Sequence, residues 1–116
     1  MNRLLTFLIA ANLNIALFAS PHCPSADVKA LDHAVKKYKP KKIIFFASWC
    51  KNCKEHLTKE NLSSSIFVAA FDEKDRAEKV MNAFFKDTDH VVCLWDADQT
   101  IVKKYKVKGL PFEVEI

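Results

Sequence analysis

Four short apolar runs punctuate the chain after residue 40, and each has the length of a strand. Three of them, residues 42–47, 66–71 and 90–95, are largely continuous, which is typical of strands buried on both faces of a sheet. The fourth, residues 112–116, alternates apolar side chains with glutamates and so predicts a strand with one buried face. The first run is the best candidate for a central strand.

The segments between these runs repeat apolar residues at helical spacing. Residues 28–38 carry one such stripe behind Ser25, which is a suitable N-cap. A capping-box pair, Asp75 and Glu78, precedes a second stripe, and residues 100–106 form a third, shorter one. With a further helix expected directly after the first strand, helices and strands alternate along one domain. This order implies an α/β sheet with helices on both faces.

The stretch that follows the first strand ends in two cysteines, Cys50 and Cys53, with two residues between them. No Gly or Pro follows up to residue 60, so we expect a helix to begin at the cysteines and to end at a polar break over residues 61–65. A cysteine at a helix N-terminus is favoured as thiolate, with a pKa lowered from ~8.5 to roughly 3.5–7.5. The flanking Lys51 and Lys54 act in the same direction. The spacing predicts dithiol-disulfide exchange, with Cys50 as the exposed nucleophile and Cys53 as the resolving thiol.

A structural zinc site is the main alternative for this cysteine pair. Such a site needs further ligands, usually a second pair at comparable spacing, and Cys23 and Cys93 are each solitary in the sequence. His56 follows Cys53 by three residues and is a candidate third ligand, a candidate proton acceptor for Cys53, or a surface histidine. We expect no bound metal and no other cofactor.

Composition and the first residues indicate where the protein works. Half of the 116 residues are hydrophobic, enough for a single core, and the formal charge of +4 is dispersed, without a signal for nucleic acid. Residues 4–18 form an apolar run behind Arg3, which predicts a signal peptide, residues 1–19, cleaved after Ala19. A retained anchor is the alternative, although a membrane span needs ~20 apolar residues. We therefore expect a mature domain of residues 20–116, periplasmic or secreted, without a stable membrane anchor.

Disulfides persist in that compartment, so Cys23 and Cys93 are candidates for a second, structural bridge. The alternative is a buried Cys93 that packs as a small hydrophobic residue and a free thiol on Cys23. Sequence alone does not fix the connectivity of four cysteines, and both interpretations stay open at this point.

Residues 49–53 (Trp-Cys-Lys-Asn-Cys) follow a predicted buried strand, and residues 107–111 (Val-Lys-Gly-Leu-Pro) precede a later one. Together these two motifs resemble the thioredoxin superfamily. Because a strand and a helix, roughly residues 66–86, and then residues 95–99 intervene before the second motif, the chain looks most like the extracytoplasmic TlpA/ResA-like branch. The resemblance implies a thioredoxin-like fold, with a central mixed sheet flanked by helices. It also implies a cis peptide bond before Pro111 opposite the dithiol, a Leu110 backbone that pairs with an extended substrate peptide, and Trp49 as a cap on the site.

By the same resemblance we expect a protein-disulfide oxidoreductase that acts on cysteine-containing extracytoplasmic proteins and is served by a redox partner protein. The family suggests a reductase, with apocytochrome or metal-site cysteines as a narrower class of substrate. Stabilisation of the Cys50 thiolate would instead make the disulfide more oxidising. The alternative from another class is a non-catalytic thioredoxin-like module that binds a metal or a partner.

Three positions depart from the pattern of the family. Ile44 stands where many thioredoxins carry a buried acid, His56 where TlpA-like proteins often carry Glu, and Thr58 where a proline usually kinks the helix. The proton-transfer partner of Cys53 is therefore open. Related proteins also continue into a further strand and a closing helix, so we expect a C-terminally short domain with an exposed edge, reduced stability and a complete dithiol site.

Overall fold

The computed structural model describes residues 22–85 and 91–116, so the expected signal peptide lies outside the described residues. Four strands form one mixed sheet in the order β3-β2-β1-β4. Strands β1, β2 and β3 are parallel, and β4 runs antiparallel to β1. The strands are β1 (Lys42–Phe46), β2 (Ser65–Ala69), β3 (Cys93–Trp95) and β4 (Phe112–Glu115).

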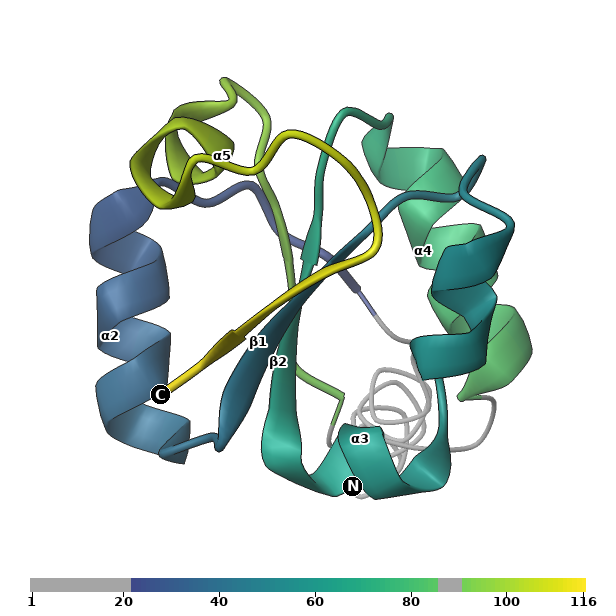
Figure 1. Cartoon of the computed structure of the whole chain (residues 1–116), viewed down its shortest axis with the longest axis horizontal. Helices are drawn as coiled ribbons and strands as arrows, with labels where there is room; N and C mark the ends of the chain where they lie inside the picture. Colours follow the sequence, from purple (N-terminus) through teal and green to yellow (C-terminus); the bar gives the residue numbers. More distant parts are fainter. Residues whose placement is uncertain (1–21, 86–90) are drawn as a thin grey trace, which may run out of the picture.

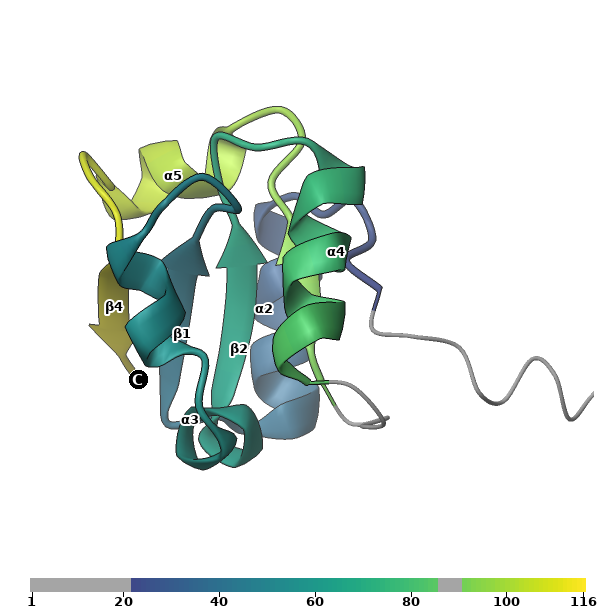
Figure 2. The same ribbon diagram turned by 90° about the vertical axis from the view of Figure 1, so that its right-hand side faces the viewer.

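Helices cover both faces of this sheet. Helices α2 and α5 lie on one face, whereas α4 and the segment around η1 lie on the other (Figure 1), and the view turned by 90° shows α4 in front of the sheet and α2 behind it (Figure 2). The prediction of an α/β sheet flanked by helices is thus confirmed. The helices are α2 (Val28–Tyr38), the 3-10 helix η1 (Asn52–His56), α3 (Lys59–Ser64), α4 (Lys74–Phe84) and α5 (Thr100–Tyr105).

The central strand β1 is buried on both faces, as its continuous apolar run predicts. Ile43 and Phe45 contribute to the hydrophobic cluster beneath α2 and α5, and Ile44 and Phe46 to the cluster beneath α4. Successive side chains of a strand point to opposite faces, so one strand supplies both cores. Strand β4 alternates half-buried and exposed residues, and Phe45 is paired with Phe112 in the register of β1 and β4.

The single helix expected after the cysteines is instead two short helices. Helix η1 ends at His56, and its C-cap Leu57 has φ −90° and ψ 71°. Helix α3 then begins anew with Thr58 as its N-cap. The Thr58 hydroxyl accepts a hydrogen bond from the Asn61 N–H at 3.2 Å. The predicted polar break at residues 61–65 is therefore wrong, because most of that segment is helical. The prediction of one continuous helix relied on the lack of Gly and Pro. It did not take into account that the hydroxyl of Thr58 makes a better hydrogen bond at an N-cap than inside a helix.

Two predicted helix starts are also wrong. Asp27 caps α2 in place of Ser25, because its carboxylate accepts the Ala30 N–H at 2.9 Å. Helix α4 begins after Glu73, which makes no capping hydrogen bond through its side chain. Glu78 does not complete a capping box but accepts the Cys23 N–H at 2.8 Å, a long-range contact that the local pattern does not contain.

A disulfide joins Cys23 to Cys93, with their Cα atoms 4.6 Å apart. Both residues are buried, so the interpretation of Cys23 as a free thiol is wrong. The bridge fastens the segment before α2 alongside β3, where the Ala26 N–H donates to the Trp95 carbonyl at 2.9 Å and the Trp95 N–H donates to the Pro24 carbonyl at 2.8 Å.

None of the helices in residues 22–85 and 91–116 has both the length and the apolar character needed to cross a membrane.

Candidate functional site

The second disulfide, Cys50–Cys53, lies just beyond the carboxyl end of the central strand β1. Three residues separate Phe46, the last residue of β1, from Cys50, and η1 then carries Cys53. The Cα atoms of the two cysteines are 5.3 Å apart. The exposed fraction is 5% for Cys50 and 1% for Cys53, so the expectation of an exposed Cys50 is wrong for the disulfide form. Both sulfurs belong to the core cluster beneath α4, and Cys50 is the more accessible of the two.

The local electrostatics differ from those expected of a long helix. Helix η1 has five residues of 3-10 geometry, so only a few peptide dipoles add along its axis. In the disulfide form, the Cys53 N–H donates a hydrogen bond to Cys50 Sγ at 3.2 Å. The same donor would favour a thiolate on Cys50 once the pair is reduced. Lys51 and Lys54 are exposed on either side of Cys53.

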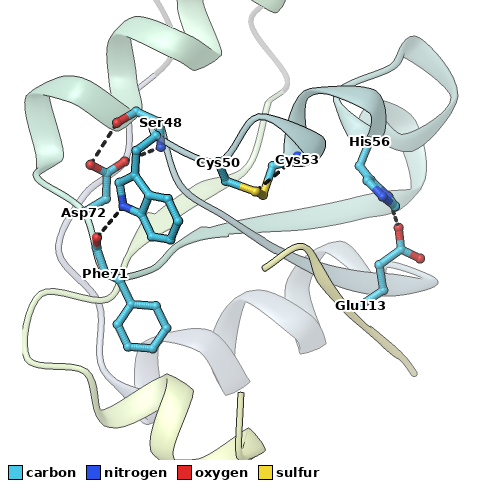
Figure 3. The surroundings of a disulfide bond; sticks show 8 residues. Ser48, Cys50, Cys53, His56, Phe71, Asp72 and Glu113 are labelled. Carbon is cyan, nitrogen blue, oxygen red and sulfur yellow. Dashed lines mark hydrogen bonds and ion pairs between the residues drawn. A yellow bond between two sulfur atoms is a disulfide. The ribbon is translucent and has the colours of Figure 1, made fainter. Parts of the chain in front are cut away.

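A carboxylate from the β2–α4 loop fixes the segment that leads to Cys50 (Figure 3). One oxygen of Asp72 accepts the Ser48 N–H at 2.6 Å, and the other accepts the Ser48 hydroxyl at 2.9 Å and the Glu73 N–H at 2.8 Å. Sequence analysis missed this contact. The available signal was topological, since the carboxyl ends of neighbouring parallel strands share one edge of the sheet.

Two tryptophans bind backbone carbonyls of the same β2–α4 loop. Trp49 Nε1 donates to the Phe71 carbonyl at 2.9 Å, and Trp95 Nε1 donates to the Asp72 carbonyl at 2.9 Å. The exposed fraction of Trp49 is 60%, so its ring is fixed at the polar edge while most of its surface faces solvent. Phe71 is also exposed and has a left-handed backbone conformation, with φ 56°.

The loop before β4 lies at the same end of the sheet as the dithiol, because β4 runs antiparallel to β1 (Figure 1). The Leu110–Pro111 peptide bond is cis, as the resemblance implies. Leu110 is half-buried and packs against the core cluster that contains both cysteines. The sheet therefore brings together residues from two distant parts of the chain.

His56 is engaged by a glutamate of β4. Its Nδ1 lies 2.6 Å from Glu113 Oε2, and Lys42 Nζ lies 3.3 Å from the other oxygen. Partial burial alone would raise the pKa of Glu113, but the hydrogen bonds and positive charges of His56 and Lys42 lower that pKa below the ordinary glutamate value. The His56 ring is directed toward Glu113 in Figure 3, and among the described residues no hydrogen bond joins it to Cys53.

The part of the chain that the structure describes contains no group of three or more His, Cys, Asp or Glu side chains arranged to hold a metal ion. Within these residues, His56 and the cysteine pair therefore do not form the ligand set considered from the sequence.

No protein-family model, curated protein or solved structure matches the chain. The site consists of a disulfide at a strand end, an aromatic residue beside it in the sequence, and a loop with a cis-proline at the same edge of the sheet.

Proposed function

We propose that the chain is a thiol-disulfide oxidoreductase with a thioredoxin-like fold, which exchanges disulfides with extracytoplasmic proteins through Cys50 and Cys53. The observation that supports this most is the position of the pair. Two cysteines three residues apart close a disulfide at the carboxyl end of the central strand, the edge where α/β sheets commonly bind their ligands. A structural bridge would gain little from so short a loop, because stabilisation by a disulfide grows with the length of chain enclosed.

The exchange itself needs no cofactor. In the reduced protein the Cys50 thiolate attacks one sulfur of a substrate disulfide, forms a new S–S bond with it and releases the other sulfur as a thiolate. The Cys53 thiol then loses its proton, attacks Cys50 Sγ and releases the second substrate sulfur. Two electrons have passed to the substrate, which leaves as a dithiol, and the protein holds the Cys50–Cys53 disulfide. A partner protein with a dithiol of its own must restore the reduced pair.

We propose the direction of a reductase. The strongest argument for an oxidant was thiolate stabilisation by a long helix after Cys50, and a five-residue 3-10 helix supplies less of it. The hydrogen bond from the Cys53 N–H to Cys50 Sγ acts in the oxidising direction. Because the short helix contributes less than a long helix would, we nevertheless expect a potential below the ~−120 mV that is typical of strong oxidants.

The second disulfide supports an oxidising compartment. Cys23 and Cys93 are 70 residues apart in the sequence, and their bridge is buried. Both features are typical of structural disulfides in secreted and periplasmic proteins. It is consistent with a signal peptide at residues 1–19.

Trapping of the mixed disulfide tests the proposal. A Cys53→Ala variant retains the nucleophile but cannot resolve the intermediate, so it should accumulate a covalent adduct on Cys50 when mixed with a disulfide-bonded protein. Cys50→Ala is the matched control and should trap nothing. Adducts on Cys53 in the control variant, with none on Cys50, would reverse the roles. A purified protein with stoichiometric metal and no exchange would instead favour a non-catalytic module.

A further inference from the structure

Phe71 has a backbone conformation that its residue type disfavours. Four non-glycine residues in the described part of the chain have positive φ, and the other three, Lys39, Gln99 and Lys106, each cap a helix. Phe71 caps no helix, because α4 has Glu73 as its N-cap. A bulky side chain at φ 56° is uncommon, and such positions cluster at functional sites.

The backbone at residue 71 supports contacts that order the loop, but the phenyl ring of Phe71 does not take part in these contacts. The Phe71 carbonyl accepts the Trp49 indole N–H, and the next residue, Asp72, binds Ser48. Glycine or asparagine would adopt the same conformation more readily and would present the same carbonyl. The positioning of the loop therefore does not explain why a phenylalanine stands there.

The ring also contributes little to the core. Phe71 is 39% exposed and belongs to neither hydrophobic cluster. Trp49, at 60% exposure, is joined to it through the indole hydrogen bond. Because that bond already satisfies the only polar atom of the Trp49 side chain, the two rings present apolar surface with no donor left unpaired.

We propose that Phe71 and Trp49 together bind an apolar side chain next to the substrate cysteine, and that Phe71 determines this specificity. The inference rests on the proposed disulfide exchange. In a mixed disulfide with Cys50, the Cα of the substrate cysteine lies about 4.4–6.8 Å from that of Cys50, and each further residue adds at most ~3.8 Å. A residue one or two positions from the substrate cysteine is therefore within reach of Trp49, which precedes Cys50 directly. Phe71 is joined to Trp49 through the hydrogen bond from the indole N–H to the Phe71 carbonyl.

The proposal names a substrate class: an extended segment with an aromatic or large aliphatic residue adjacent to its disulfide-bonded cysteine. Aromatic side chains are frequent anchors in interfaces because they bury much apolar area at a low entropic cost. Such segments are normally buried in folded proteins, so the surface fits a substrate that is unfolded or still folding.

Exchange rates of Phe71 variants with three oxidised probes test this proposal. The probes are a disulfide-linked peptide with phenylalanine beside its cysteine, the same peptide with serine in that place, and 2-hydroxyethyl disulfide, which is small and uncharged. The variants are Phe71→Gly and Phe71→Asn, which suit a positive φ, and Phe71→Tyr, which retains the ring. Phe84→Ala is the matched control, since Phe84 is comparably exposed but lies on α4.

Phe71→Gly and Phe71→Asn should lower the rate constant for the phenylalanine peptide about tenfold, which corresponds to about 1.4 kcal/mol of transition-state binding. Their rates with 2-hydroxyethyl disulfide should stay within about twofold of wild type, and their melting temperatures should not fall, because the strained conformation is relieved. Phe71→Tyr and Phe84→Ala should both retain the preference for the phenylalanine peptide over the serine peptide.

Other outcomes overturn one proposal or the other. Equal rates of wild type and Phe71→Gly with the phenylalanine peptide would remove the binding role. If Phe71→Gly instead lowered the rate with 2-hydroxyethyl disulfide as much as the rate with the peptide, Phe71 would be a positioning residue of the dithiol loop and not a binding residue. A lower melting temperature in both Gly and Asn variants would make the ring a packing element. No reaction of reduced wild type with any of the three probes would overturn the exchange function itself, and the specificity proposal with it.

Discussion

Replacement of Asp72 by alanine should destabilise the fold and loosen the dithiol loop together. The carboxylate accepts three hydrogen bonds in a partly buried site, two from Ser48 and one from the Glu73 N–H. Hydrogen bonds to a charged group contribute about 1.5–3 kcal/mol each when buried, and partial exposure reduces this to roughly 1 kcal/mol each. We therefore expect Asp72→Ala to lower the free energy of unfolding by about 2–4 kcal/mol, against a total of about 5–15 kcal/mol for a typical domain.

Urea denaturation of the oxidised protein measures this loss, and Asp75→Ala is its matched control. Asp75 is an exposed aspartate in the first turn of α4, three residues away, with no side-chain hydrogen bond among the described residues. Its replacement should change stability by less than about 0.5 kcal/mol. Asp72→Ala should also slow exchange at Cys50 with 2-hydroxyethyl disulfide, because Ser48 would no longer be fixed and the segment that leads to Cys50 would become looser. Equal stability of the two alanine variants would refute the assignment of Asp72 as the clamp on this loop.

Three further predictions concern contacts away from the dithiol. Replacement of Cys23 and Cys93 by alanine should reduce stability by about 2–4 kcal/mol in urea denaturation yet leave exchange intact, and a folded variant without exchange would contradict a structural role. Glu113→Gln should reduce stability by roughly 0.2–1 kcal/mol above pH 4.5, the ordinary pKa of the group. Because the folded pKa is lowered, this difference should close as the pH falls through it, and a pH-independent difference would exclude the ion pair with His56 as its cause. Asp96→Ala removes a buried acceptor of two N–H groups of α5 and should lower the free energy of unfolding by about 1–3 kcal/mol in urea denaturation. A loss below about 0.5 kcal/mol would show that water replaces the carboxylate.

The four strands followed from sequence because each is short, apolar and bounded by polar residues. Residues 43–46 of β1 are buried on both faces, so their run of apolar residues is unbroken. Strand β4 (Phe112–Glu115) has one covered face, so its pattern alternates. The helix boundaries were less accurate, since capping depends on which of several suitable side chains points back at the backbone. Asp27 caps α2 although Ser25, two residues earlier, is also a suitable residue type, and Thr58 begins a new helix within a segment that contains no Gly or Pro.

The candidate site was predicted where its residues belong to a short sequence motif, and the cis bond before Pro111 followed from the second motif of the resemblance. Cys50, Cys53 and Trp49 form one motif, and the dithiol could be located from it. The Ser48–Asp72 contact joins residues 24 apart, and the His56–Glu113 contact joins residues 57 apart. Neither has a local signature, because side-chain pairs across the sheet edge are set by strand order rather than by spacing along the chain.

The central claim is that Cys50 and Cys53 pass two electrons to a substrate disulfide. Mass spectrometry of a single reaction tests it directly: protein reduced only at this pair is mixed with an equal amount of a disulfide-bonded peptide, then alkylated and digested. The peptide should gain two alkylated thiols while the protein regains the Cys50–Cys53 bridge, and Cys50→Ala should gain no bridge and reduce no peptide. A wild-type protein that keeps both thiols alkylated beside an intact peptide disulfide would contradict it.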